Sequence, residues 1–242
     1  LEHEKAYLNW LDDVFARYPD LVIENCSSGG LRIDYALLSR YSIQSTSDQE
    51  DYRNYATIAA NAAAGVTPEQ AAVWSYPMRQ GDKEEVIYNM INAMLLRVHQ
   101  SGHLAQLPPE RLALVKEGIA CYKTIRQDIK YAVPYWPLDI ADNEDMWVCG
   151  GLQLENKAYL AVWKRQMEGK NNDRHMKAGI NCTDDSLSIP LDSIPFVRDG
   201  MQVSCIYPKK EPVDFEFKGN VLTVHFKKPV MARLFELRKG IV

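Results

Sequence analysis

Two short polar stretches near the N-terminus carry the residue types that could do chemistry, Ile23–Asp34 and Gln44–Asp51. The first stretch contains the adjacent glycines Gly29 and Gly30. Because glycine has no Cβ, the backbone there can adopt positive φ angles, and a ligand can approach the main chain closely. We therefore expect a loop that presents its backbone N–H groups to a ligand.

Charged side chains follow both loops. The guanidinium group of Arg32 can hold hydroxyl groups of a ligand, and the carboxylate of Asp34 can orient that guanidinium group. Asp48 follows a second run of apolar and hydroxyl residues. An acidic residue at the carboxyl end of a barrel strand lies on the catalytic face. Asp48 is therefore expected on that face.

Short apolar or β-branched runs precede the loops and predict parallel strands. Leu21–Ile23 lies between the turn-forming pair Pro19-Asp20 and the glycine loop, as is typical of a buried parallel strand. Tyr41–Thr46 and Ala71–Tyr76 predict the second and third strands. Within the third strand, Trp74 could stack on a sugar ring or pack in the core.

Two motifs in this region, Glu24-x-Cys26-Ser-Ser-Gly29-Gly30-x-Arg32-x-Asp34 and Ser47-Asp48-x-x-Asp51, occur in this order. Together they resemble the signature of the glycoside hydrolase family 36 α-galactosidases. The resemblance implies a retaining mechanism with two aspartates, a (β/α)8 catalytic barrel and a C-terminal β-sandwich. It implies that Asp48 is the general acid/base. With Trp74 added from its place in the third strand, the expected substrate-binding residues are Cys26, Ser27, Gly29, Gly30, Arg32, Asp34, Asp51 and Trp74.

The sequence departs from the family pattern at several positions. Leu31 stands where the family usually has a third glycine, and Tyr55 stands where it tends to have an arginine, with Arg53 two positions earlier. A retaining glycosidase also needs a nucleophilic carboxylate about 5–5.5 Å from the acid/base. In the family this carboxylate lies upstream in a Lys-x-Asp motif, and no Lys-x-Asp occurs in these 242 residues. The resemblance therefore implies a truncated enzyme, without the nucleophile and the first four strands, that is expected to be inactive alone.

The rest of the chain divides into three predicted parts. Residues 1–130 are expected to form the C-terminal part of the barrel, with its last strand at 101–107, where His103 could contact a substrate hydroxyl. Residues 131–145 are a turn-rich acidic connector, and 146–242 carry seven short alternating runs suited to an antiparallel β-sandwich, with a hairpin turn at Gly219-Asn220 and a solvated polar loop over 168–175. The predicted fold is thus the second half of a (β/α)8 TIM-type barrel followed by a β-sandwich. The apolar periodicity predicts four helices, over 3–18, 52–64, 83–99 and 109–128.

The composition places few other limits on function. With 46% hydrophobic and 25% charged residues and a net charge of −4, the chain is typical of globular proteins and has no basic excess for nucleic acid. No apolar run is long enough for a membrane span. The five cysteines have no metal-ligand spacing, and unpaired thiols favour a reducing, cytoplasmic environment. No cofactor or metal is expected.

Three functions remain open. The first is hydrolysis of terminal α-galactosidic bonds in oligosaccharides. The second is another reaction of the same family, either galactosyl transfer or α-N-acetylgalactosaminidase activity. The third is a non-catalytic carbohydrate-binding remnant. Since a half barrel exposes strand edges, its expected partners are an α-galactoside, the missing N-terminal half of the barrel or a second copy of the chain.

Overall fold

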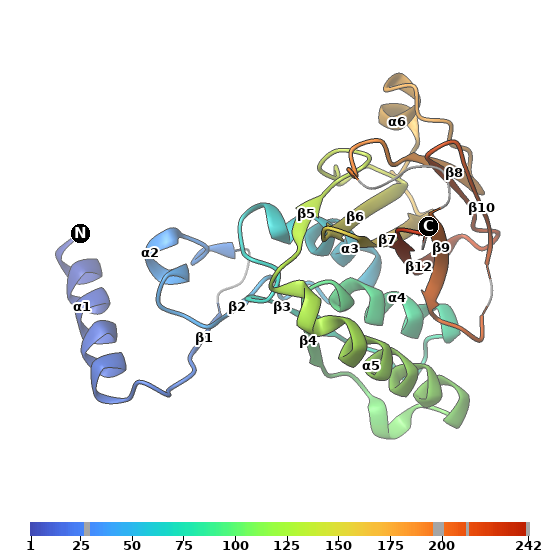
Figure 1. The fold of residues 1–242 in the computed structure, drawn as a ribbon. Helices are drawn as coiled ribbons and strands as arrows, with labels where there is room; N and C mark the ends of the chain where they lie inside the picture. The colour runs from blue at the N-terminus through green and yellow to red at the C-terminus, as the bar shows by residue number, and fades with distance from the viewer. Residues whose placement is uncertain (27–29, 196–200, 212, 241–242) are drawn as a thin grey trace.

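The computed structural model describes residues 1–26, 30–195, 201–211 and 213–240. The N-terminal part contains a four-stranded parallel sheet in the order β1-β2-β3-β4 (Figure 1). Its strands are β1 (Glu24–Asn25), β2 (Ile43–Ser45), β3 (Ala71–Ser75) and β4 (Arg97–Gln100). The helices of this part are α1 (Glu2–Arg17), α2 (Tyr35–Leu38), α3 (Tyr52–Asn61), α4 (Lys83–Met94) and α5 (Pro109–Ile129).

Three of these helices begin with an aspartate. The side chain of Asp34 accepts a hydrogen bond from Leu37 N, and α2 begins there. Asp51 and Asp82 cap α3 and α4 in the same way. An aspartate at this position satisfies one of the free N–H groups of the first turn. Each capping residue therefore sets the point at which the loop after a strand becomes a helix.

The first strand differs from the prediction. Leu21 and Val22 are 43% and 62% exposed, and β1 begins only at Glu24. Among the described residues, β1 pairs with β2 on one side and has no partner on the other. The apolar run at 21–23 therefore has no surface to pack against, and pairing is confined to two residues.

The helix predicted over 83–99 is shorter in the structure. Helix α4 ends at Met94, and the chain then turns directly into β4. Val98 fits a helical period as well as an alternating one, so the sequence alone does not separate the two. In the structure Val98 pairs with Val73 of β3, and this pairing makes the segment around Val98 a strand.

The strand predicted at 101–107 is wrong. Gly102 has a φ of +83°, and a Cβ at this position would lie 2.5 Å from the carbonyl oxygen of Pro77. A 3₁₀ turn, η3 (Leu104–Gln106), follows. The segment packs as a loop against the end of β3, because β4 has already filled the place of the fourth strand.

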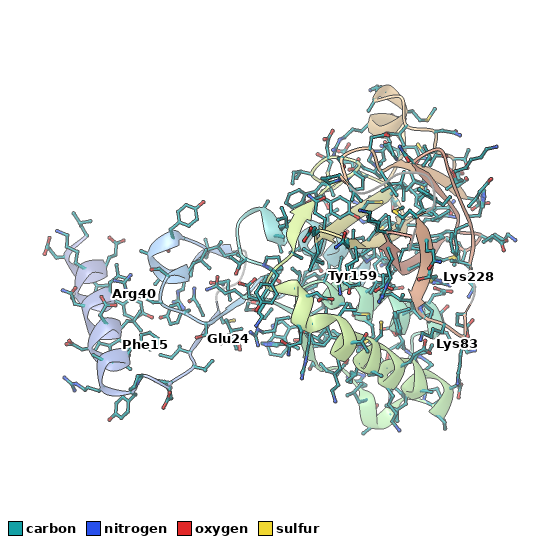
Figure 2. The ribbon with its side chains drawn as sticks, in the orientation of Figure 1. Phe15, Glu24, Arg40, Lys83, Tyr159 and Lys228 are labelled. Carbon is teal, nitrogen blue, oxygen red and sulfur yellow. The ribbon has the colours of Figure 1, made fainter. Side chains whose placement is uncertain are left out.

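Helix α1 forms as predicted but does not pack on the sheet. Leu11 is its one fully buried residue, and Figure 1 shows the helix standing apart from the sheets. Its main contacts are with the segment around α2. Figure 2 shows Arg40 beside α1. Arg40 forms a two-pronged ion pair with Asp12 at 2.7 and 2.8 Å, and the hydroxyl groups of Tyr7 and Tyr41 are in contact.

The C-terminal part consists of two antiparallel sheets and the short helix α6 (Asp173–Lys177). All seven strands predicted after residue 146 are present. The five-stranded sheet has the order β5 (Val133–Tyr135), β6 (Trp147–Gln153), β7 (Lys157–Arg165), β12 (Val230–Arg238), β9 (Gln202–Tyr207). The three-stranded sheet has the order β10 (Asp214–Lys218), β11 (Val221–His225), β8 (Ser186–Pro190). The predicted turn at Gly219-Asn220 joins β10 to β11 with positive φ angles at both residues, 57° and 62°.

The five-stranded sheet is buried on both faces, and alternate residues along β7 show this. Tyr159 and Trp163 belong to one core with residues of α4 and α5. Leu160 and Val162 belong to a second core with residues of the three-stranded sheet. One core therefore joins helices of the range 1–130 to strands of the range 146–242. The division into three parts stays a prediction.

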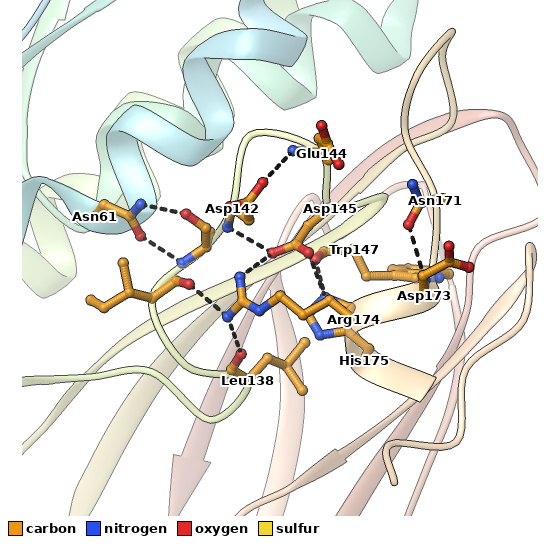
Figure 3. Close-up of polar contacts among 12 residues, drawn as sticks. Asn61, Leu138, Asp142, Glu144, Asp145, Trp147, Asn171, Asp173, Arg174 and His175 are labelled. Atoms are coloured by element: carbon orange, nitrogen blue, oxygen red, sulfur yellow. Dashed lines mark hydrogen bonds and ion pairs between the residues drawn. The ribbon is translucent and has the colours of Figure 1, made fainter. Parts of the chain in front are cut away.

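The connector before β6 is held against α3. The side chain of Asn61 bonds both the N–H and the carbonyl group of Ala141, at 2.9 and 2.8 Å (Figure 3). Trp136 Nε1 donates to the carbonyl oxygen of Ala60 at 2.7 Å. These contacts tie the connector to the helix that follows β2.

A buried carboxylate fixes the end of the connector. Asp145 accepts hydrogen bonds from Arg174 Nη1 at 2.8 Å and from the N–H of Asp142 at 2.7 Å (Figure 3). His175, buried nearby, contacts the carbonyl oxygen of Trp147 at 2.8 Å. The prediction of a solvated loop over 168–175 is therefore wrong at its end, where α6 begins and packs.

Candidate active site

The predicted acid/base Asp48 and the predicted binding residue Cys26 lie at the carboxyl edge of the parallel sheet, as does Tyr76. Cys26 follows β1, Asp48 lies three residues after β2, and Tyr76 follows β3. Because parallel strands end at the same edge, the loops after them meet there. Cys26 and Asp48 are both exposed, as groups that meet a ligand must be.

Acidic groups on neighbouring loops influence Tyr76. Partial burial raises the pKa of the Tyr76 hydroxyl. The neighbouring acidic groups of Glu50, Asp48 and Cys26 raise this pKa further. Asp48 and Glu50 belong to the loop after β2 and Cys26 follows β1, so charges on both neighbouring loops act on Tyr76. The motifs did not single out Tyr76; the signal for it was its place at the end of the third predicted strand, Ala71–Tyr76.

An aromatic cluster lies behind this edge. Trp74 stacks on Tyr76 with ring centroids 6.0 Å apart and meets His99 edge to face at 5.0 Å. Trp74 Nε1 also donates to Ser45 Oγ at 3.2 Å. These contacts come from three neighbouring strands and hold the indole ring in place. Trp74, which is half-buried, both packs and borders the site.

Side-chain contacts close the loop between Cys26 and Arg32. Arg32 Nη1 donates to the carbonyl oxygen of Cys26 at 3.1 Å, and Asn25 Nδ2 donates to the carbonyl oxygen of Arg32 at 2.9 Å. Asn25 also bonds Gln44 Oε1 of β2 at 2.6 Å. Gly30 has a φ of +72°, as the sequence predicts for this loop. The predicted binding residues Ser27 and Gly29 lie outside the described residues.

Asp34 has a different contact from the expected one. Its carboxylate caps α2 through Leu37 N at 3.0 Å, while Arg32 is held by the main chain of the loop. Asp34 therefore caps a helix and does not orient Arg32 as the sequence predicted. A carboxylate engaged by a helix N-terminus contributes to the position of the segment.

The backbone around Asp48 is anchored to α3. The hydroxyl group of Tyr55 donates to the carbonyl oxygen of Ser47 at 3.1 Å and shares a hydrogen bond with Thr46 Oγ1 at 2.8 Å. Thr46 Oγ1 also donates to the carbonyl oxygen of Ala72 on β3 at 2.9 Å. Tyr55 is 2% exposed. The residue that departs from the family pattern thus holds the main chain next to Asp48.

Asp51 is turned toward a neighbouring arginine. Its carboxylate forms a two-pronged pair with Arg53, at 2.9 Å to Nε and 2.6 Å to Nη2. The hydrogen bond from Arg53 is the main reason that the pKa of Asp51 lies below its ordinary value. Asp51 stays ionised at neutral pH and borders a groove beside the site.

Buried side chains organise the loop after β3. Glu85 accepts from Met78 N at 2.9 Å and from Arg111 Nη2 at 2.7 Å. Arg111 also donates to the carbonyl oxygens of Met78, Arg79 and Asp82. Only 4% of Arg111 is exposed. Because its guanidinium group bonds three carbonyl groups and a carboxylate, Arg111 fixes the conformation of this loop.

His103, considered for a substrate contact, is exposed at the same end of the sheet. Its Nδ1 accepts from the N–H of Arg79 at 3.5 Å, so it borders the loop after β3. Within the described residues no group of three or more histidine, cysteine, aspartate or glutamate side chains is arranged to hold a metal ion. Of the helices in the described ranges, none has the length and apolarity needed to span a bilayer.

No protein-family model matches the sequence, and no curated protein is similar to it. Solved structures do share its fold. The galactosidase domain of an α-galactosidase–sucrose kinase, AgaSK, superposes with a TM-score of 0.69 at 18% identity over 96% of this chain and 30% of that one. A variant of the family 36 α-galactosidase AgaA from Geobacillus stearothermophilus, in complex with raffinose, has a TM-score of 0.69 at 15% identity over 94% of this chain and 30% of that one.

An α-galactosidase from Lactobacillus brevis has a TM-score of 0.65 at 15% identity, over 96% of this chain and 31% of that one. The chain therefore spans about 30% of the length of the structures it matches. At these identities the likeness is one of fold. The protein has the fold of a part of the glycoside hydrolase family 36 α-galactosidases, the family whose motifs residues 24–51 resemble.

Proposed function

We propose that this chain supplies the acid/base carboxylate and part of the galactose pocket of a retaining α-galactosidase. The observation that carries the proposal is the position of Cys26, Asp48 and Tyr76, each just after one of three neighbouring strands at the carboxyl edge of a parallel sheet. The motif that contains the first two residues resembles that of family 36, and the fold match points to the same family.

In the proposed reaction Asp48 protonates the glycosidic oxygen while a nucleophilic carboxylate attacks the anomeric carbon. The leaving alcohol departs, and galactose is held as a covalent ester of the nucleophile. Asp48, now ionised, takes a proton from water, and the resulting hydroxide equivalent releases galactose with net retention. The nucleophile is assigned to residues outside these 242. Arg32 and the loop from Cys26 to Gly30 would hold ring hydroxyl groups.

The outer strands of the parallel sheet support a barrel. Three strand spacings of about 4.8 Å would separate β1 from β4 by about 14 Å in a flat sheet. Nevertheless, Glu24 Oε1 of β1 lies 3.6 Å from His99 Nδ1 of β4. The two outer strands therefore direct these side chains toward each other on one face of the sheet, an arrangement that suits the inner wall of a barrel. The proposed domain is a half barrel whose inner face carries Glu24, Trp74 and His99.

The edges of this sheet support completion by further strands. Within the described residues β1 has β2 as its only neighbour and β4 has only β3, so each outer strand has one open edge. Large apolar side chains are exposed near the β1 edge, among them Leu31 at 84% and Tyr35 at 85%. Uncovered strand edges and apolar surface favour association. We propose that the segment carrying the nucleophile pairs here.

The proposed substrate class is a neutral α-galactoside. The matched structures include complexes with raffinose and with stachyose, both of which are bound by those enzymes. The exposed Cys26 backbone, Arg32 and the aromatic cluster offer hydrogen bonds and a ring face of the kind that sugars need. Transfer of the galactosyl group to a second sugar uses the same covalent ester, with an alcohol in place of water.

The test compares an aryl α-galactoside as substrate for the 242-residue chain and for the complete product of its gene, with the intact mass of each recorded. Only the product that contains the nucleophile is expected to turn over. Asp48→Asn in that product should lower kcat by about 10²–10⁴-fold, the contribution of general acid–base catalysis, with galactose binding retained. The control is Asp13→Asn, an exposed carboxylate on α1.

Normal turnover in Asp48→Asn would remove Asp48 from its role. Activity of the 242-residue chain alone would place the nucleophile within it. Galactosylated products that appear only with an added acceptor sugar would identify transfer as the main reaction.

A further inference from the structure

Arg165, the last residue of β7, is a completely buried cation, 0% exposed. Its Nε donates to the carbonyl oxygen of Arg53 at 2.8 Å, and its Nη1 donates to the carbonyl oxygen of Asp145 at 3.2 Å. Its Nη2 donates to Asn54 Oδ1 at 3.3 Å. All three acceptors are neutral. Within the part of the chain that the structure describes, the guanidinium group therefore has hydrogen bonds but no ion pair.

A buried charge without a counter-ion destabilises a fold, because its hydration is lost and no opposite charge replaces it. Burial accordingly lowers the pKa of Arg165. The adjacent residue Lys164 is equally buried, on the opposite face of β7, but it pairs with Asp185 at 2.6 Å. Stability alone therefore does not explain an arginine at position 165, and residues that break a stability rule are commonly functional.

The contacts of Arg165 hold the first turn of α3. Figure 1 shows α3 beside β6, the strand that pairs with β7. Arg53 and Asn54, which accept hydrogen bonds from Arg165, are the second and third residues of α3. The main chain of Arg165 is itself fixed, because its N–H donates to the carbonyl oxygen of Met146 at 2.7 Å. One guanidinium group thus joins the C-terminal sheet to the start of α3.

A series of local hydrogen bonds connects this turn to the loop that carries Asp48. In this series an N–H group donates to the side chain two residues earlier, and the donors are Gln49, Asp51 and Arg53, at 3.1, 3.0 and 2.9 Å. Asp48 lies inside the series. Tyr55 holds one end through the carbonyl oxygen of Ser47, and Arg165 holds the other end through the carbonyl oxygen of Arg53.

We propose that Arg165 is a positioning residue for Asp48, acting through the first turn of α3. The inference rests on the proposed α-galactosidase function, in which Asp48 must meet the glycosidic oxygen. Proton transfer needs the two heavy atoms within hydrogen-bond reach, so a displacement of the loop by about 1 Å can lower the rate by about a hundredfold. The C-terminal sheets thereby take a part in catalysis that neither the motifs nor the fold match assigns.

The experiment compares Arg165→Met and Arg165→Lys in the complete gene product. Methionine keeps an apolar stem, and lysine keeps the charge without the planar fork of donors. The matched control is Lys164→Met, because Lys164 is also 0% exposed but bonds the carbonyl oxygen of Phe226 on the other side of the sheet. The measurements are Tm, kcat and KM on an aryl α-galactoside, and amide hydrogen exchange over residues 47–55.

In Arg165→Met we expect kcat to fall about tenfold to hundredfold with KM within about twofold, and Arg165→Lys should lie between this variant and the unaltered protein. Exchange over 47–55 should become about tenfold faster in Arg165→Met, because the loop has lost one of its anchors. Lys164→Met should lower Tm, yet below its Tm both kcat and exchange over 47–55 should stay within about twofold.

Unchanged kcat or unchanged exchange over 47–55 in the Arg165 variants would overturn the positioning role and leave the α-galactosidase proposal standing. An equal loss of kcat in Lys164→Met would also overturn it, because the effect would then be one of general stability. If Arg165→Met does not fold, Arg165→Lys against Lys164→Met decides by the same two criteria. If the unaltered protein does not cleave the aryl α-galactoside, the proposed function is wrong and the positioning role falls with it.

Discussion

Replacement of Arg111 by methionine is the sharpest test of how the loop after β3 is held. Methionine keeps an apolar stem of similar length but removes the guanidinium group. The structure loses hydrogen bonds to the carbonyl oxygens of Met78 at 2.6 Å, Arg79 at 2.9 Å and Asp82 at 3.0 Å. It also loses the 2.7 Å contact to Glu85, in which both side chains are 5% exposed.

Breaking a buried ion pair by removing one partner costs about 3–5 kcal/mol, because the other charge stays buried without compensation. In a protein of this size each kcal/mol lowers Tm by about 2–4 °C. We therefore expect Arg111→Met to lower the free energy of unfolding by about 3–5 kcal/mol and Tm by about 6–20 °C. Differential scanning calorimetry at pH 7 measures both.

The loss of stability in Arg111→Met should depend on pH. Burial raises the pKa of Glu85 above its ordinary value of 4.5, and the N–H of Met78 and the charge of Arg111 oppose this rise. Removing Arg111 raises the pKa of Glu85 further. A carboxyl group whose pKa is higher in the folded state favours folding most when protonated, and this contribution is lost as pH rises through the folded pKa. Arg111→Met should therefore cost less at pH 5 than at pH 7.

Two further variants separate this reasoning from a general packing effect. Lys116→Met changes an exposed side chain on the same helix and should alter stability by no more than about 0.5 kcal/mol. Adding Glu85→Gln to Arg111→Met removes the buried carboxylate that has lost its partner and should restore part of the lost stability. A cost below about 1 kcal/mol for Arg111→Met, or no recovery in the double variant, would refute the ion-pair argument.

Two other predictions concern the site itself. Tyr55→Phe keeps the packing of the ring but removes the hydrogen bond to the carbonyl group next to Asp48, so kcat of the complete gene product on an aryl galactoside should fall roughly tenfold to hundredfold with KM within twofold. An unchanged kcat would remove Tyr55 as a positioning residue. Cys26 is exposed, whereas burial raises the pKa of Cys121 to about 11. Iodoacetamide at pH 8 should therefore modify Cys26 first, with added galactose slowing the reaction, and peptide mass mapping would expose the reverse order.

Local patterns predicted the C-terminal sheets well. Alternation along runs such as Ala158–Trp163 follows from a sheet with two distinct faces, and the pair Gly219-Asn220 has the backbone freedom that a tight hairpin turn needs. These signals depend on neighbours within a few residues. The same rules failed at the end of α4, where Val98 fits a helix and a strand equally and its partner Val73 lies far away in the sequence.

Some residues of the candidate site could likewise be predicted from the sequence, and others could not. The motifs around Cys26 and Asp48 were visible because their residues are close together in the chain, and the loop geometry at Gly30 follows from the glycine itself. Tyr76 and Tyr55 were missed because their roles depend on contacts between different loops.

The sequence of this protein determined the motifs around Cys26 and Asp48, the glycine loop and the alternation of its strands, since each depends on residues near one another in the chain. Only the tertiary structure brings Glu24 within reach of His99 and Lys228 within reach of Glu84. Glu84 and Lys228 are 144 positions apart. Contacts at such separation arise from the packing of whole elements, which leaves no periodic signal in the chain.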